Sequence, residues 1–289
     1  MSVIINMACG LANRMFQYAF YLYLQKEGYD AYVDYFTRAD LVHENVDWLR
    51  IFPEATFREA TARDIRKMGG GHDCFSRLRR KLLPMTTKVL ETSGAFEIIL
   101  PPKNRDSYLL GAFQSAKMVE SVDAEVRRIF TFPEFESGKN QYIQTRLAQE
   151  NSVGVHIRKG KDYQERIWYK NTCGVEYYRK AVDLMKEKVD SPSFYVFTDN
   201  PAWVKENLSW LEYKLVDGNP GSGWGSHCDM QLMSLCKHNI ISNSSYSWWG
   251  AYLNNTLNKI VVCPRIWFNP ESTKEFSSNP LLAEGWISL

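Results

Sequence analysis

The order of hydrophobic and polar positions predicts a β-loop-α-β unit at the start of the chain. Residues 3–7 form a short apolar run typical of a strand, residues 15–27 carry apolar side chains on most faces of a helix, and residues 31–35 return to a strand pattern. Gly28 ends the predicted helix. The chain therefore begins as an α/β domain. A further strand is predicted at 107–113 and a further helix at 116–130.

The second half of the chain also alternates strands and helices, as in a doubly wound sheet. Its first predicted strand, 153–157, carries β-branched residues and then breaks into charge, which is typical of a buried parallel strand leaving the sheet at its carboxyl end. Residues 133–138 interrupt the pattern, so we assign two domains, 1–140 and 141–289. The other predicted strands are 194–198, 213–216, 239–242 and 259–263, and the clearest helices are 175–188 and 229–238.

Composition narrows the class of protein without naming a function. The 289 residues are 45% hydrophobic and 24% charged, which fits a globular chain of two domains of about 150 residues or of one large α/β domain. A net charge of +2 gives no nucleic-acid signature. No run of about 18 apolar residues and no basic leader is present, so we expect no membrane span and no export.

The spacing of cysteines and histidines argues against a disulfide framework and against a zinc site. The six cysteines contain no C-x-x-C pair, which favours reduced, buried thiols in the cytoplasm. The five histidines show no ligand spacing, so a structural zinc is not expected. The chain also lacks a D-x-D sequence, and we predict that its activity needs no metal and no cofactor.

The first stretch with candidate chemistry follows the strand at 153–157. His156, Arg158 and Asp162 surround the edge of the sheet where ligands of open α/β sheets bind. A guanidinium can hold two phosphate oxygens at once, and Gly160 lets the backbone turn sharply. These residues predict a site for a phosphate ester, and a solvated charged turn is the alternative interpretation.

Two later stretches also follow predicted strands. Asp199-Asn200-Pro201 comes after the strand at 194–198, where an acid commonly contacts a ribose or base, although the same residues also start helices. Residues 243–250, N-S-S-Y-S-W-W-G, offer hydroxyl and N–H groups at a helix start, which suits a pyrophosphate. The alternative is a serine N-cap followed by two core tryptophans.

Two weaker patterns leave their interpretation open. The loop at 8–13 could present N–H groups to an anion, but it is not a G-x-G-x-x-G sequence, and taken alone it favours a tight structural turn. Basic residues alternate with leucines around residue 80, as on a solvated helix face or a membrane-surface patch. The basic residues of this segment are Arg77, Arg79, Arg80 and Lys81.

Four motifs connect the chain to a known family. Residues 9–19, C-G-L-A-N-R-M-F-Q-Y-A, match a pattern like G-G-L-G-N-Q-M-F-Q-Y-A, and residues 156–163 match H-x-R-R-G-D-Y. Residues 197–200 match F-S-D-D. Residues 232–236 match L-M-S-x-C, and residues 243–250 match N-S-S-F-S-W-W-G. Over nearly its whole length the chain resembles the α-1,2-fucosyltransferases of glycosyltransferase family 11.

The chain departs from the family pattern at a few positions. Ala12 and Arg14 replace a glycine and a glutamine, and Lys159 replaces the second arginine of the H-x-R-R box. Lys161 is an extra residue before Asp162, so the register of that aspartate within the box differs from the pattern.

The resemblance implies a fold and a reaction. The fold would be α/β of the GT-B type, with two Rossmann-like domains facing a cleft, GDP-fucose in the C-terminal domain and the acceptor in the N-terminal domain. The enzyme would be a galactoside 2-α-L-fucosyltransferase that moves L-fucose, with inversion, from GDP-β-L-fucose to the 2-hydroxyl of a terminal β-galactose. The acceptor would be an oligosaccharide, lipid-linked ones included, and the enzyme would be cytoplasmic or peripheral at the inner face of the membrane.

The resemblance also assigns roles to residues. Arg158 would stabilise the departing phosphate, and the proton of the acceptor hydroxyl would pass to Asp162 or to another acid. Asn13 would orient either the acceptor or the phosphate. His156 and Asp199 would contact the nucleoside. The other donor-side residues are Asn243, Ser244, Ser245 and Ser247, and the acceptor-side residues are Asn13, Arg14 and Gln17.

Alternatives from other classes stay open. A fucosyltransferase of another linkage and a non-catalytic module that binds a nucleotide sugar or glycan would carry a similar site. A nucleotide-dependent oxidoreductase would need a G-x-G-x-x-G after the first strand, which this sequence does not have.

Overall fold

A computed structural model describes residues 2–35, 48–68, 74–75, 78, 82, 88–91, 100–167, 169, 172–269 and 279–289. The chain divides into two compact units, Met1–Thr131 and Phe132–Leu289. The predicted boundary after residue 140 falls inside helix α7 (Gly138–Gln149), which packs against α11 (Cys228–Leu235) of the second unit. Because α7 packs against elements of the second unit, the boundary between the units comes before this helix.

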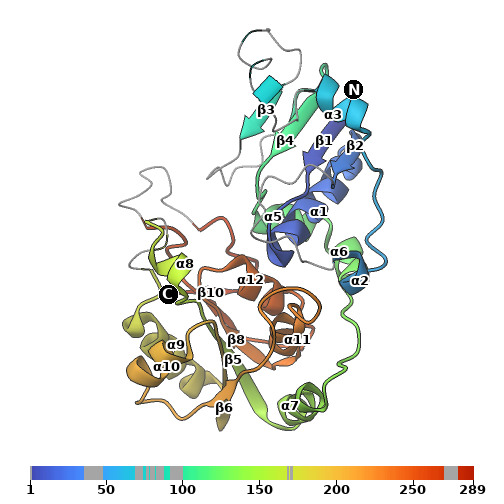
Figure 1. The fold of residues 1–289 in the computed structure, drawn as a ribbon. Helices are drawn as coiled ribbons and strands as arrows, with labels where there is room; N and C mark the ends of the chain where they lie inside the picture. The colour runs from blue at the N-terminus through green and yellow to red at the C-terminus, as the bar shows by residue number, and fades with distance from the viewer. Residues whose placement is uncertain are drawn as a thin grey trace. The chain divides into compact units, whose positions relative to one another are not determined.

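The first unit is built on a parallel sheet of four strands in the order β2-β1-β4-β3 (Figure 1). The strands are β1 (Ser2–Asn6), β2 (Asp30–Asp34), β3 (Lys88–Glu91) and β4 (Ser107–Leu110). Helix α1 (Leu11–Lys26) connects β1 to β2 and buries Met15, Phe16 and Phe20, which confirms the predicted β-loop-α-β unit. Because α1 begins at Leu11 and not at residue 15, the loop before it is shorter than expected.

The later part of the first unit differs from the prediction in two places. The strand expected at 107–113 ends at Leu110, since the backbone of Phe113 turns into the left-handed region (φ 50°) and its ring stacks on Phe20 at 4.2 Å. The helix expected at 116–130 is broken at Val122 into α5 (Ala116–Ser121) and α6 (Asp123–Ile129). Two further short helices are α2 (Trp48–Ile51) and α3 (Ala62–Lys67).

The second unit contains a parallel sheet of six strands in the order β10-β9-β8-β5-β6-β7, with β5 near its centre. In Figure 1, α9 (Val175–Lys188) and α10 (Pro201–Asn207) lie on one side of this sheet, and α11 and α12 (Ser245–Tyr252) lie on the other. A short helix, α8 (Lys161–Gln164), follows β5. The strands are β5 (Asn151–Ile157), β6 (Pro192–Thr198), β7 (Lys214–Val216), β8 (His238–Ile240), β9 (Val261–Cys263) and β10 (Ile287–Ser288).

Close packing around β5 explains the small residues of this unit. A Cβ atom at Gly154 would lie 3.0 Å from the sulfur of Cys236, and one at Gly250 would lie 2.9 Å from Cβ of Met233. Glycine therefore lets α11 approach both β5 and α12. The apolar side of β5, with Val153, Val155 and Ile157, packs against α9 through Tyr178, Ala181, Val182 and Met185.

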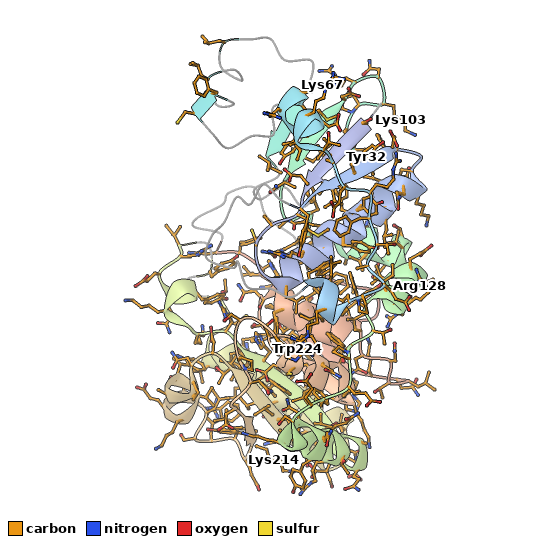
Figure 2. The ribbon with its side chains drawn as sticks, turned by 45° about the vertical axis from the view of Figure 1, so that its right-hand side comes forward. Tyr32, Lys67, Lys103, Arg128, Lys214 and Trp224 are labelled. Carbon is orange, nitrogen blue, oxygen red and sulfur yellow. The ribbon has the colours of Figure 1, made fainter. Side chains whose placement is uncertain are left out.

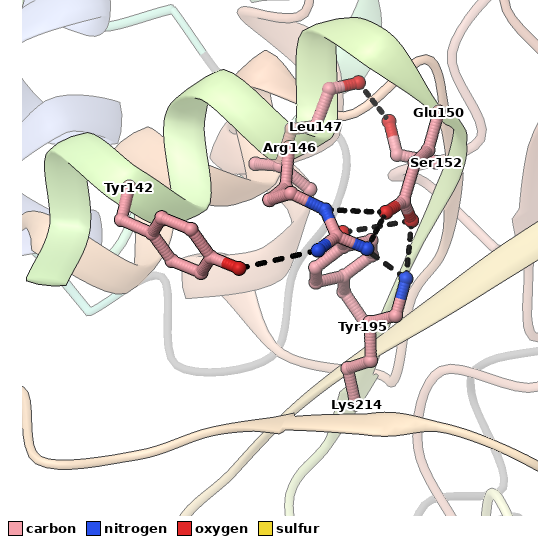
Figure 3. A network of polar contacts seen from close by, with 7 residues as sticks. All are labelled: Tyr142, Arg146, Leu147, Glu150, Ser152, Tyr195 and Lys214. Atoms are coloured by element: carbon pink, nitrogen blue, oxygen red, sulfur yellow. Dashed lines mark hydrogen bonds and ion pairs between the residues drawn. The ribbon is translucent and has the colours of Figure 1, made fainter.

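A polar cluster fastens the amino end of β5 to its neighbours (Figure 3). The Glu150 carboxylate accepts hydrogen bonds from Nε of Arg146 at 2.7 Å and from the Tyr195 hydroxyl at 2.9 Å, and it forms ion pairs with Arg146 and Lys214. Burial opposes ionisation, but the donors that surround Glu150 outweigh it and lower its pKa to about 2. Figure 2 shows Lys214 at the edge of this unit. The cluster joins α7, β5, β6 and β7.

The predicted α/β fold class, with two Rossmann-like parallel-sheet domains, is confirmed for each unit. No helix in the described part of the chain is long and apolar enough to cross a bilayer. The six cysteines, all of them among the described residues, form no disulfide. Cys173, Cys236 and Cys263 are buried as predicted, whereas Cys74 is exposed.

Candidate active site

The ends of β5 and β6 bring two charged side chains together. Ile157 pairs in register with Thr198, so Arg158 and Asp199 occupy equivalent positions just beyond the paired strands. The Arg158 guanidinium forms an ion pair with Oδ2 of Asp199 at 2.9 Å. The two side chains are 35% and 23% exposed. The pair therefore lies, accessible to solvent, at the carboxyl edge where ligands of such sheets bind.

Asn200 fixes the turn that follows β6. Its Oδ1 accepts a hydrogen bond from the N–H of Trp203 at 3.0 Å, which caps α10, and Pro201 occupies the first helical position. Its Nδ2 donates to the carbonyl of Lys159 at 2.8 Å. The helix-start interpretation of this stretch is confirmed, and the turns after β5 and β6 are tied together.

His156 is buried and uncharged. Its Nδ1 lies 2.8 Å from Oγ of Ser242, and its ring lies beside that of Tyr246. Burial, with a smaller contribution from the Arg158 charge, lowers the pKa of His156 to about 3. The imidazole is therefore neutral at physiological pH and joins β5 to the segment that leads into α12.

Asn243 holds the loop after β5 against the start of α12. Its Nδ2 donates to Oγ1 of Thr172 at 2.9 Å and to the carbonyl of Trp267 at 2.7 Å, and its Oδ1 accepts from the Tyr163 hydroxyl. The Cys173 thiol also donates to Oδ1 at 3.3 Å. Asn243 is buried among these contacts and joins the loop to the segment before α12.

The serine cluster is divided between the interior and the surface. Ser247 is fully buried, and its hydroxyl donates to the carbonyls of Ser242 and Ser244 at 3.4 and 3.2 Å. Ser244 is the N-cap of α12 and Ser245 is its first residue, and both are half-buried. The helix starts within the cluster, so the N–H groups of Ser245 and of the residues after it belong to the first turn of α12.

Lys159 lies beside Arg158 in a different environment. Its Nζ donates to the carbonyl of Thr172 at 3.3 Å and lies 5.4 Å from the centre of the Trp203 ring. Burial lowers the pKa of Lys159 below its ordinary value. This cation therefore packs inside the loop, and Arg158 is the cation that faces the carboxyl edge.

In the first unit, the loop before α1 is held by buried side chains. Gln17 accepts from the N–H of Ala8 at 3.0 Å and donates to the carbonyl of Gly111 at 2.9 Å. Arg14 donates from Nε to the carbonyl of Cys9 at 2.8 Å, and Cys9 has a left-handed backbone (φ 73°). These contacts support the interpretation of the loop as a structural turn.

Of the three predicted acceptor-side residues, Asn13 is the one with an accessible side chain. Arg14 and Gln17 are buried, whereas Asn13 is half-buried and its Oδ1 accepts from Nε2 of Gln114 at 2.9 Å. Arg14 and Gln17 therefore support the loop, and Asn13 is the acceptor-side candidate that stays partly exposed.

Some predicted residues lie outside the described part of the chain. The side chain of Asp162 does so, although its backbone belongs to α8. The basic residues Arg77, Arg79, Arg80 and Lys81 do so as well. Among the described residues, no group of three or more His, Cys, Asp or Glu side chains could hold a metal ion.

Comparison with known sequences now decides the family. The family described as "Glycosyl transferase family 11" matches residues 92–289, which include every element of the site in the second unit. The chain belongs to this family.

Three relatives of this family 11 chain are 31–35% identical to it over part of their length. An "Alpha-1,2-colitosyltransferase" from Escherichia coli is 35% identical over 48% of this chain and 48% of its own length. The "O-antigen biosynthesis glycosyltransferase WbnK" from the same organism is 32% identical over 63% of this chain and 60% of its own length. The "Galactoside alpha-(1,2)-fucosyltransferase 2" of Rattus norvegicus is 31% identical over 35% of this chain and 29% of its own length. The chain thus matches these relatives over less than two thirds of their length.

Solved structures are similar at lower identity. The fucosyltransferase NodZ from Bradyrhizobium is 13% identical, with a TM-score of 0.46 over 86% of this chain and 93% of that one. Arabidopsis thaliana FUT1 is 11% identical, with a TM-score of 0.48 over 94% of this chain and 73% of that one.

Sequence reasoning did not single out the start of α11 in this family 11 protein. Asp229 is held at Oδ1 by Nδ2 of Asn219 at 2.7 Å, and burial raises its pKa to about 6. Five residues earlier, in the preceding loop, Trp224 (labelled in Figure 2) donates from Nε1 to Glu136 at 3.1 Å. Its ring packs beside that of His227. The available signal was the position of Asp229 just before the matched motif at 232–236.

Proposed function

We propose that the chain is an inverting fucosyltransferase that moves L-fucose from GDP-β-L-fucose to the 2-hydroxyl of a terminal β-galactose. The acceptor is an oligosaccharide, either free or lipid-linked. Membership in family 11 and the α-1,2-transferases among the relatives support the proposal. The observation that carries it is Arg158, which lies at the carboxyl edge of the second sheet, directly after β5, the strand that His156 joins to the start of α12.

This arrangement suits a departing GDP. As the bond to fucose breaks, negative charge grows on the β-phosphate, and a guanidinium can hold two of its oxygens in fixed geometry. The positive end of α12 adds N–H donors, and the hydroxyls of Ser244 and Ser245 lie beside it. These groups can replace a divalent cation, and we propose that none is required.

The transfer also needs a group that accepts the proton of the attacking hydroxyl. Neutral His156 is buried against Ser242 and Tyr246, so we assign it to holding the site and not to this step. Asp162 or another acid takes the proton, and Asn13 orients the acceptor or the phosphate.

Colitose is a second candidate for the transferred sugar. The support is the E. coli relative named as an α-1,2-colitosyltransferase, at 35% identity. A competition assay with GDP-fucose and GDP-colitose at equal concentration would rank the two donors by their ratio of kcat/KM. We expect GDP-fucose to be preferred, and exclusive use of GDP-colitose would move the chain to the second function.

The class of protein is tested by turnover in the presence of EDTA. We expect release of GDP that depends on a β-galactoside acceptor and that EDTA leaves unchanged. Binding of GDP-fucose without any product would instead indicate a non-catalytic module. Loss of turnover in EDTA that magnesium or manganese restores would contradict the metal-independent mechanism.

A further inference from the structure

We infer that Asp199 is a positioning residue, which holds the Arg158 guanidinium in the orientation that the sugar donor requires. This inference rests on the proposed function, since it assumes that Arg158 binds the phosphate of GDP-fucose. It replaces the contact with the nucleoside that the sequence predicted for Asp199.

The carboxylate of Asp199 is fixed by the backbone. Its Oδ1 accepts from the N–H of Lys159 at 2.7 Å, while its Oδ2 faces Arg158 at 2.9 Å. The adjoining turn is fixed too, because the N–H of Asn200 donates to Oγ1 of Thr198 at 3.0 Å and its side chain bridges to Lys159. Asp199 is therefore an anchored acceptor and not a side chain free to follow a ligand.

Both carboxylate oxygens of Asp199 already contact donors of the protein. A ribose hydroxyl could reach this carboxylate only by sharing or displacing one of the two contacts. In contrast, the two contacts suit a role in orienting Arg158, whose long side chain loses rotamer freedom when it is held in one geometry. The ion pair holds the Arg158 guanidinium in one geometry before GDP-fucose binds.

The charge of Asp199 predicts a distinctive effect on binding. A carboxylate beside a phosphate site repels the anionic ligand, so it cannot serve mainly to raise affinity for GDP. Its benefit must appear where the orientation of Arg158 matters most, as charge develops on the departing phosphate. Removing the charge should therefore lower kcat and leave the affinity for GDP unchanged or slightly higher.

A double-mutant cycle tests this coupling. The variants are Asp199→Asn, Arg158→Lys and their combination, with Asp183→Asn as the matched control because Asp183 lies on the exposed face of α9. We expect Asp199→Asn alone to lower kcat about 10- to 100-fold, with the Kd of GDP changed less than about threefold. In the Arg158→Lys background, the same substitution should lower kcat less than about threefold, because it acts through the guanidinium.

Other outcomes are equally informative. A native kcat in Asp199→Asn, or losses that multiply in the double variant, would overturn the inference. Weaker binding of both GDP and GMP at an unchanged kcat would overturn the positioning role and indicate that Asp199 contacts the nucleoside. If Asp199→Asn does not fold, Asp199→Ser, which keeps an acceptor near the N–H of Lys159, is taken through the same cycle. Wild-type protein without any GDP-fucose turnover would instead defeat the proposed function.

Discussion

Two neighbouring cations of the second unit differ in what they can do. Arg158 is paired with Asp199 at the edge of the sheet and stays partly exposed, whereas Lys159 is packed between Trp203 and Tyr163, where burial lowers its pKa. The side chain that family sequences carry as a second arginine is thus part of the loop packing here. Arg158 is the residue whose replacement should change the chemistry.

Arg158→Lys should keep the fold and lose most of the turnover. An ammonium keeps the charge but cannot hold two phosphate oxygens at fixed spacing. We expect kcat to fall about 10²- to 10³-fold, with a smaller change in the affinity for GDP-fucose. Steady-state kinetics and a thermal melt check this, with the exposed Arg265→Lys as control. A native kcat in Arg158→Lys would remove Arg158 from the active site.

Glu150→Gln should lower the free energy of unfolding at neutral pH and make it depend less on acid pH. The folded pKa of Glu150 is about 2, below the ordinary 4.5, so the folded state binds fewer protons than the unfolded state between these values. The stabilisation is present above pH 4.5 and is lost as the pH falls toward 2. After screening by solvent, we expect a loss of about 1 kcal/mol at pH 7.

Urea unfolding at pH 7, 5 and 3.5 measures this effect. The wild type should lose stability between pH 5 and 3.5 more steeply than Glu150→Gln, because the variant has no carboxylate to protonate. The exposed residue Glu187 of α9 supplies the control, Glu187→Gln, which should follow the wild type. Equal slopes in Glu150→Gln and the wild type would show that the cluster in Figure 3 does not stabilise the fold.

At the residue scale, the sequence predicted candidate positions for the site but not the partners of these residues. Arg158 and Asp199 were each recognised at a strand end, but their contact depends on the register of Ile157 against Thr198, which no local pattern contains. In the same way, a run of small polar residues could not show that Ser247 turns inward while Ser244 and Ser245 stay half-buried.

At the element scale, the contact between α11 and α12 sets the shape of the serine cluster. Gly250 lies where α12 crosses α11, and an added Cβ would meet Cβ of Met233 at 2.9 Å and the carbonyl of Met230 at 3.3 Å. The glycine at the end of the N-S-S-x-S-W-W-G motif is therefore a packing requirement, which places the N-terminus of α12 against the carboxyl edge of the sheet.

Gly250→Ala should be destabilising although alanine favours helices. The gain in helix propensity, about 1 kcal/mol, is smaller than the overpacking cost of about 1–3 kcal/mol, because the backbone of α11 must shift. We expect a net loss of unfolding free energy in a urea titration. Gly138→Ala is the control, since an added Cβ at this first residue of α7 meets no atom within 4 Å. A variant at Gly250 as stable as the wild type would contradict this packing.

Element types were predicted better than element boundaries. Hydrophobic periodicity predicted β5, β6 and α9, because their buried faces are long and regular. Periodicity did not predict α7, which is largely polar and stays on the surface of the unit, nor did it predict that α12 begins at Ser245. In both cases tertiary packing, and not local pattern, decides where the helix begins.

At the scale of the whole molecule, the two units carry different parts of the proposed reaction. The residues proposed to bind the phosphates of GDP, Arg158, Ser244 and Ser245, follow strands β5 and β8 of the second unit. Parallel sheets in both units follow from the alternation of strands and helices along the sequence. That alternation could not set the division at Thr131, since the sequence of α7 does not show which of the two units the helix belongs to.

GDP alone should protect the second unit from hydrogen exchange. We expect slower exchange in the segments 156–163, 198–203 and 241–250 when GDP is added, because the nucleotide orders the carboxyl edge of the sheet. Hydrogen exchange with mass spectrometry at saturating GDP measures this, and adenosine diphosphate serves as the control nucleotide. Protection confined to residues before Phe135 would contradict the assignment of the donor to this unit.

The most direct test of the central claim is the linkage in the product. Purified protein is incubated with GDP-fucose and a β-galactoside acceptor, and NMR of the isolated product identifies the bond formed. We predict an α-fucosyl residue on the 2-hydroxyl of galactose, as inversion of the β-linked donor requires. A product with fucose at another hydroxyl, or a β-linked fucose, would contradict the proposed function.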